Sequence, residues 1–193
     1  MKFEEFSHII ISVVTVSIAF AIAWTGMTEF TPEFASVFVL ILVTVGSGFI
    51  LHELAHKYVA IRYGAHAEYR SWTLGLVLAI GMAVLFGFVF AAPGAVYIYG
   101  RNLTKEQNGR IALAGPATNA VLAIAFLALA FFEPSLSGLA KTGASVNAFL
   151  GLFNLIPIFP LDGSKVLAWS RGAWMTAVAT LTILMLIAPS AIG

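Results

Sequence analysis

Long runs of hydrophobic residues alternate with short polar stretches along this chain. The runs cover approximately residues 6–24, 35–60, 110–132, 142–159 and 166–188. Each approaches the ~20 residues that a helix needs to cross the ~30 Å hydrocarbon core of a bilayer. No repeat or domain-sized polar segment separates them. The pattern therefore predicts a single domain over residues 1–193, an all-α polytopic membrane protein with about five transmembrane helices.

A further apolar region, residues 72–98, is long enough to cross the membrane but contains several residues that weaken helices. These are Gly75, Gly81, Gly87, Pro93 and Gly94. If this region returns to the face from which it entered, nine of the ten Lys and Arg residues lie on one side and only Lys141 on the other. Such asymmetry is typical of membrane proteins, whose cytoplasmic loops are rich in Lys and Arg. We therefore expect a membrane-embedded re-entrant or β-hairpin element over 72–98 that lines a groove.

The composition agrees with a membrane protein and excludes other classes. Hydrophobic side chains make up 60% of the chain and charged ones 10%, whereas a soluble domain carries ~25% charged residues. A net charge of +1 provides no basic face for the phosphate backbone of a nucleic acid. Because the chain has no cysteine, disulfides and thiolate metal sites are excluded.

Three ionisable residues nevertheless lie inside the second predicted helix, in the stretch His-Glu-Leu-Ala-His at 52–56. On a helix, His52 and His56 project from one face and can reach one metal ion, with Glu53 beside them where a reacting water would sit. Each ionisable group in the middle of a spanning helix costs roughly 2.5–3.5 kcal/mol on insertion scales. A hydrolytic zinc site is therefore a stronger interpretation than a polar cluster that joins helices.

A catalytic zinc held by two histidines needs a third protein ligand and an open fourth position. His66 and Glu68 are candidates, although their polar surroundings favour a solvated connector. Asp162, the only aspartate of the chain, follows Pro157 and Pro160 on the basic side of the membrane. It could be the third ligand or simply a cap of the last helix. The remaining candidates lie at the chain start, on the opposite side of the membrane or in an exposed loop: His8, Glu29, Glu33, Glu106 and Glu133.

Three motifs occur in order: HELAH at 52–56, AGPATN at 114–119 and NLIPIFPLDG at 154–163. Together they resemble the site-2 protease family of intramembrane zinc metalloproteases, over about residues 35–172. The resemblance implies that His52, His56 and Asp162 bind one Zn²⁺ per chain and that Glu53 is the catalytic general base. It also implies that Asn154 contacts the substrate or the oxyanion. The residues implied to support the site or the substrate are Gly115, Pro116 and Asn119.

The resemblance further implies hydrolysis of peptide bonds within or near transmembrane segments of membrane-protein substrates, as in regulated intramembrane proteolysis. The implied partners are a transmembrane peptide and the lipid bilayer, not nucleic acid. The implied location is the cell membrane, with the active site toward the cytosol. Many relatives have Gly-Arg where this chain has Ser164-Lys165, and no PDZ insertion or C-terminal regulatory domain is recognisable, so we expect a minimal form. The alternative is a non-proteolytic membrane protein that binds metal or haem through His52 and His56, which would not require Glu53.

Overall fold

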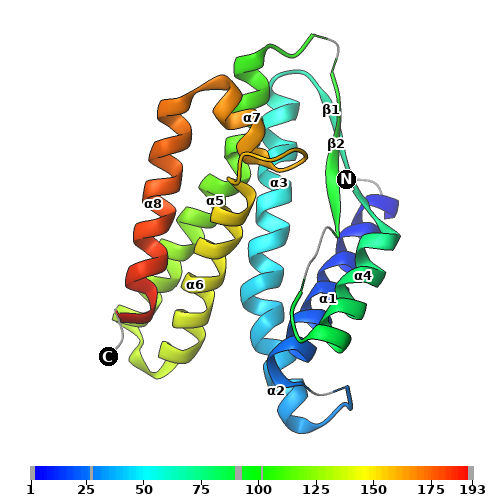
Figure 1. Ribbon diagram of the computed structural model, residues 1–193, viewed down its shortest axis with the longest axis vertical. Coiled ribbons are helices and arrows are strands. Elements are labelled where there is room, and N and C mark those ends of the chain that lie inside the picture. The colour runs from blue at the N-terminus through cyan, green and yellow to red at the C-terminus, as the bar shows by residue number, and fades with distance from the viewer. Residues whose placement is uncertain (1–2, 27, 90–92, 101, 191–193) are drawn as a thin grey trace. The chain divides into compact units, whose positions relative to one another are not determined.

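The computed structural model describes residues 3–26, 28–89, 93–100 and 102–190, and helices dominate it (Figure 1). The helices are α1 (Phe3–Thr25), α2 (Pro32–Ile41), α3 (Ser47–Arg62), α4 (Thr73–Phe86), α5 (Lys105–Phe132), α6 (Ser137–Asn154), α7 (Asp162–Trp169) and α8 (Arg171–Ser190). A π-helical turn, Leu42–Gly46, joins α2 to α3, and a 3-10 turn, Pro134–Leu136, precedes α6. Two strands, β1 (His66–Ser71) and β2 (Gly94–Tyr99), pair in one sheet. The all-α fold class is confirmed.

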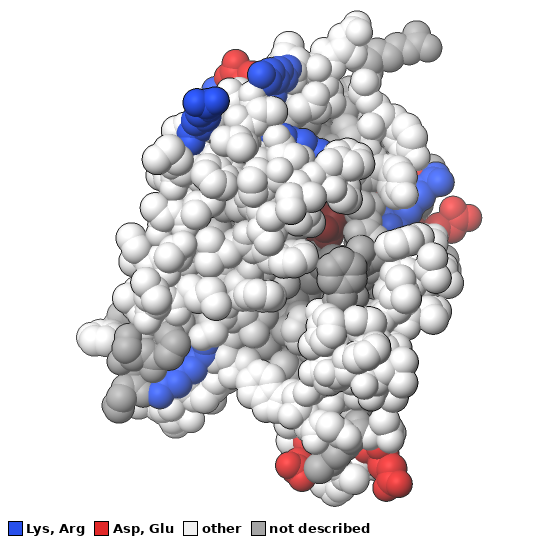
Figure 2. Space-filling view, in the orientation of Figure 1, with Lys and Arg blue, Asp and Glu red and all other residues white. Residues whose placement is uncertain are grey.

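Within the described part of the chain, four helical segments are long and apolar enough to cross a membrane. They are Phe3–Thr25, Pro32–Arg62, Lys105–Phe132 and Arg171–Ala188. The fifth expected span corresponds to α6, which has 18 residues and buries small and amide side chains. Charged side chains are sparse on the face that Figure 2 presents, where white surface dominates. The protein is therefore an integral membrane protein. Lys2 and Arg101, two of the basic residues in the charge count, lie outside the described residues.

Backbone contacts divide the chain into two compact units. The first comprises Met1–Ile50 and Glu68–Tyr97, and the second comprises Leu51–Ala67 and Ile98–Gly193. The second unit contains every residue to which the family resemblance assigns a role, whereas Glu68, one of the other candidate ligands, belongs to the first. The single domain expected over 1–193 stays a prediction.

In the first unit, small residues allow close packing of α1 against α2 and α4, as is usual between membrane helices. Its core contains Ala19, Ala21, Ile22, Phe34, Ala79 and Ala83. Hydrogen bonds from Tyr69 attach β1 to α1. The Tyr69 N–H donates to the buried Glu5 carboxylate at 3.0 Å, and the Tyr69 hydroxyl donates to Ser12 Oγ at 2.8 Å. Gly94 has a φ of +156°, and any side chain there would overlap Tyr69.

The structure of residues 72–98 agrees with the expected re-entrant element. The Trp72 N–H donates to the Pro93 carbonyl at 2.9 Å, so the chain at Pro93 has returned to the start of the segment. Between them α4 has 14 residues, which is about 21 Å of helix at 1.5 Å per residue and too short for a ~30 Å core. The element thus combines the short helix α4 with β2, which pairs with the preceding strand β1. Its residues 90–92 lie outside the described part of the chain.

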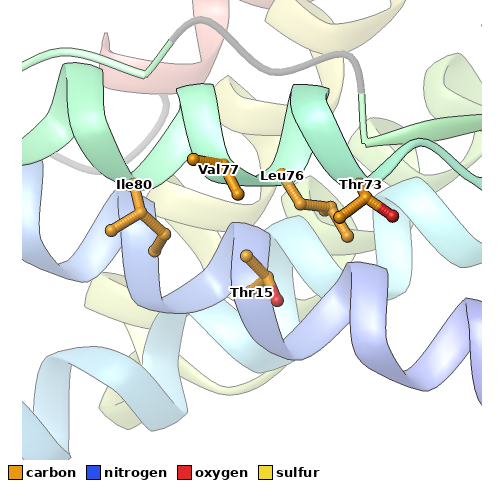
Figure 3. A pocket seen from close by; sticks show the side chains of 5 residues that line it. All are labelled: Thr15, Thr73, Leu76, Val77 and Ile80. Carbon is orange, nitrogen blue, oxygen red and sulfur yellow. The ribbon is translucent and has the colours of Figure 1, made fainter.

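A shallow groove of about 330 Å³ runs between α1 and α4 (Figure 3). Thr15 lines it from α1, and Thr73, Leu76, Val77 and Ile80 line it from α4. The lining contains no titratable or metal-binding side chain. The groove therefore offers no group for acid–base or metal chemistry.

The π-helical turn Leu42–Gly46 was not expected from the sequence. Here the Thr44 hydroxyl donates to the Leu40 carbonyl at 2.9 Å and the Ser47 hydroxyl donates to the Val43 carbonyl, so side chains compete for helix acceptors. A π turn inserts one extra residue into a helix. That insertion rotates every later side chain by about 100° relative to an unbroken α-helix. The turn therefore adds one residue to the helical path between α2 and α3.

In the second unit, α6 packs against α5 and α8, and α7 packs against α5 and α8. The core joins Ala112, Leu155, Val166 and Leu181. The apolar run expected over 166–188 is not one helix, because the chain is extended at Ser170, with φ −150° and ψ 113°. The Ser170 hydroxyl accepts a hydrogen bond from the Ala173 N–H at 3.2 Å, which caps the start of α8.

Candidate functional site

Three metal-binding side chains converge inside the second unit. His52 and His56, one turn apart on α3, are both buried, and their Nε2 atoms lie 2.9 Å apart. Asp162, the first residue of α7, places its Oδ2 atom 3.3 Å from His52 Nε2 and 3.1 Å from His56 Nε2. One ligand atom from each residue lies within 4.8 Å of the others. Among the described residues this is the group that could hold a metal ion.

Hydrogen bonds on the far side of each imidazole determine which nitrogen is free to bind a metal. His52 Nδ1 lies 2.6 Å from Asn119 Oδ1, and His56 Nδ1 lies 2.7 Å from the Ile111 carbonyl oxygen. Both partners are acceptors, so each Nδ1 carries the proton and donates it. Each Nε2 then has a free lone pair, as metal ligation by a neutral histidine requires.

Helix α5 makes room for the two histidines at Gly115. A Cβ atom at this position would lie 2.5 Å from His52 Nε2 and 2.5 Å from His56 Nε2. Only glycine allows the backbone to approach so closely. Pro116, which is also buried in α5, has no N–H, so the carbonyl of Ala112 in the preceding turn lacks its usual helical donor. This is the turn whose Ile111 carbonyl accepts from His56.

The start of α7 positions Asp162. α6 ends at Asn154 and α7 begins at Asp162, with Leu161 as its N-cap residue. A side chain at Gly163 would overlap the Leu155 carbonyl, so glycine permits α7 to begin against the end of α6. Asp162 is therefore not the cap that the sequence left as an alternative.

The donor set fits a zinc ion. Zn²⁺ in catalytic sites takes three protein ligands of the imidazole and carboxylate type. Two imidazole nitrogens with free lone pairs and one carboxylate oxygen supply that set, and the hydrogen bonds at each Nδ1 supply the usual outer support. The geometry therefore suits a hydrolytic metal centre.

The other residues that the sequence singled out are not members of this group of three. Glu53 follows His52 on α3 and is half-buried. Asn154 donates its Nδ2 hydrogen to the Leu150 carbonyl of its own helix at 2.9 Å. Neither of the other candidate third ligands belongs to the metal-binding group. His66 is exposed on β1, and the Glu68 Oε2 atom lies 3.5 Å from Arg70 Nη2.

Two partners of the site were missed in the sequence. The Ile111 carbonyl leaves no trace in a sequence, because every residue has one. Asn147 is fully buried and hydrogen-bonds Asn119. The sequence does mark Asn147, because an amide within an apolar run is unusual and polar groups inside a membrane tend to be functional.

A family model described as peptidase family M50 matches residues 38–142, more than half of the chain. The chain belongs to peptidase family M50, the site-2 protease family. The match includes His52, His56 and Asn119. Asp162 lies beyond the matched residues, in the part that the structure brings to the two histidines.

Named relatives of this M50 chain agree with that assignment. "Putative zinc metalloprotease MJ0611" of Methanocaldococcus jannaschii is 44% identical over 177 residues, which are 90% of this chain and 89% of that protein. "Putative zinc metalloprotease Rip2" of Mycolicibacterium smegmatis is 34% identical over 162 residues, 74% of this chain and 62% of that protein. "Zinc metalloprotease MJ0392" of Methanocaldococcus jannaschii is 35% identical over 136 residues, 69% of this chain but 33% of that protein. No solved structure matches the chain significantly. The M50 chain is thus a zinc metalloprotease by family.

Proposed function

We propose that the chain is an intramembrane zinc metalloendopeptidase that cleaves peptide bonds within or near transmembrane segments of membrane proteins. His52, His56 and Asp162 are the proposed ligands of one Zn²⁺ per chain. The single observation that carries the proposal is the convergence of these three side chains on α3 and α7, with two of them inside a helix long enough to cross a membrane. A metal site at such a position suits a substrate that is itself in the membrane.

The bound metal would supply a Lewis acid that polarises the scissile carbonyl and lowers the pKa of water. Glu53 accepts the proton of the attacking water at its carboxylate and later returns it to the leaving amine. Asn119 and the Ile111 carbonyl hold the Nδ1 protons of His52 and His56, which keeps both imidazoles in the required tautomer. We assign to Asn154 a contact with the substrate or its oxyanion, and to Gly115 and Pro116 the support of the histidines.

A helical substrate hides its carbonyls in hydrogen bonds to residues four positions away, so it must unwind before cleavage. The element at 72–98 offers strand backbone that can bind an extended peptide as a sheet edge does. Substrate cross-links found only at residues 6–24 or 166–188 would contradict this role. The proposed location is the cell membrane. The active site is proposed to open on the cytosolic side, in agreement with the charge asymmetry.

The experiment that tests the function compares wild type with Glu53→Gln in proteoliposomes. The probes are two quenched-fluorescent transmembrane peptides, one rich in Leu and Ala and one with Gly and Pro at its centre. We expect wild type to cleave the second peptide faster, because its helix opens more easily. In Glu53→Gln we expect turnover to fall roughly 100-fold or more, the usual contribution of a general base, with zinc content unchanged.

Glu106→Gln is the matched control, because Glu106 is an exposed acid paired with Arg110 at 2.7 Å. We expect this variant to cleave like wild type. Residual turnover of Glu53→Gln above about a tenth of wild type would refute the general-base assignment. Zinc binding without cleavage of either peptide would favour the non-proteolytic alternative.

A further inference from the structure

Asn147 on α6 begins a row of hydrogen bonds that ends at His52. Its side chain is fully buried, and its Nδ2 donates to the Gly143 carbonyl at 2.9 Å. A carbonyl can only accept, so the amide nitrogen of Asn147 must point toward Gly143. The Oδ1 atom of Asn147 consequently points the other way, toward α5.

Asn119 on α5 takes its orientation from Asn147. Asn119 Nδ2 donates to Asn147 Oδ1 at 3.1 Å. This leaves Asn119 Oδ1 facing His52, where it lies 2.6 Å from Nδ1. Because that oxygen only accepts, His52 must keep its proton on Nδ1 and leave Nε2 free.

We propose that Asn147 is a positioning residue that selects the metal-binding tautomer of His52 by fixing the orientation of the Asn119 amide. The inference rests on the proposed role of His52 as a zinc ligand. Asn147 Oδ1 accepts only from the NH₂ group of Asn119, so it disfavours the orientation in which the amide is rotated by half a turn and presents that NH₂ group to His52 Nδ1. An NH₂ group favours the tautomer with the proton on Nε2, which has no lone pair for the metal.

His56 provides an internal contrast. Its Nδ1 donates to the backbone carbonyl of Ile111 at 2.7 Å, and a backbone carbonyl cannot exchange donor for acceptor by rotating. The tautomer of His56 therefore needs no further residue. The tautomer of His52 depends on a side-chain amide that has two possible orientations, and Asn147 removes one of them.

The test measures Zn²⁺ affinity of the detergent-purified full chain by competition with a chelator. Asn147→Leu keeps the branched shape of the side chain and removes both polar atoms. We expect its affinity to fall roughly 10- to 100-fold, the range usual for groups that orient metal ligands. Thr118→Val is the matched control, since the Thr118 hydroxyl bonds the Ala114 carbonyl of its own helix at 2.9 Å. We expect this control to bind like wild type.

A double-mutant cycle separates positioning from a purely structural role. Asn119→Asp places a carboxylate against His52, and both of its oxygens accept, so no orientation remains to be selected. In that background we expect Asn147→Leu to cause no further loss of affinity. An equal loss in both backgrounds would overturn the proposal, as would an Asn147→Leu single variant that binds within about twofold of wild type, well short of the loss expected for a ligand-orienting group.

Two further comparisons keep the result interpretable. If Asn147→Leu loses helical circular dichroism, Asn147→Ala replaces it in the same cycle with the same expectations, because alanine favours the helix. Wild type that binds no zinc would overturn the proposed function together with this inference. Wild type that binds zinc, His52→Ala that loses it and Asn147→Leu that retains it would overturn the inference alone.

Discussion

Gly115 determines whether the two histidines can approach each other beside α5. An added Cβ would lie 2.5 Å from the Nε2 atom of each histidine, far inside van der Waals contact, so one or both rings must move. We expect Gly115→Ala to lower Zn²⁺ affinity at least roughly tenfold, as displaced ligands do, although alanine is the better helix former. Competition with a chelator measures the affinity.

Gly138→Ala is the control for this prediction, because nothing lies within 4 Å of a Cβ at Gly138. It makes the same chemical change in a helix of the same unit, and we expect wild-type affinity. If Gly115→Ala bound zinc as tightly as wild type, the close approach of α5 to the histidines would be contradicted.

At the scale of single residues, the side chains of the metal-binding group were predictable, and the groups that orient them were only partly so. His52, Glu53 and His56 form a recognisable pattern, and Asp162 stands out as the only aspartate. Their assignment as ligands and base stays a prediction. The Ile111 carbonyl has no sequence signature, so a sequence cannot name it as the partner of His56.

At the scale of elements, hydrophobic patterning located the helices but not the irregularities within them. The π-helical turn Leu42–Gly46 reads as ordinary helix because its residues continue the apolar run. The break at Ser170 could not be predicted from the run 166–188 either, since a single serine among many apolar residues does not indicate the end of a helix. Residues 72–98 were recognised because charge asymmetry, a property of the whole chain, added information that local pattern lacks.

The re-entrant path of 72–98 predicts that both flanking segments lie on one side of the membrane. The chain has no cysteine, so His66→Cys and Glu106→Cys each create a single labelling site. We expect a membrane-impermeant maleimide added to oriented vesicles to label both from the same side. Ser135→Cys, exposed in the turn between α5 and α6, is the control that reacts from the other side. Labelling of His66→Cys and Glu106→Cys from opposite sides would mean that the segment crosses the membrane.

At the scale of the whole molecule, backbone contacts divide the chain into two compact units, and the single domain over 1–193 stays a prediction. Sequence patterning could not reveal this, because the boundary falls inside α3, between Ile50 and Leu51, where the helix continues without a linker. The candidate metal centre belongs entirely to the second unit. It joins α3 to α7 there, and α5 contacts both histidines through Asn119 and Ile111.

A metal ion held by α3 and α7 should stabilise that unit, because a ligand that binds only the folded state adds free energy to unfolding. At a free zinc concentration about 1,000 times the Kd, the added free energy is about 4 kcal/mol. We expect a chelator to lower the melting temperature of the wild-type protein in detergent by several degrees, about 2 °C or more per kcal/mol for a chain of this size.

Asp162→Ala tests whether the chelator lowers the melting temperature by removing metal from this centre. We expect the variant to purify with little zinc and to melt at the same temperature with and without chelator, because its site has lost one of three donors. Glu106→Gln should respond to chelator as wild type does. If Asp162→Ala kept its zinc and its chelator response, the third donor would lie elsewhere, and His66 and Glu68 would be the next residues to replace.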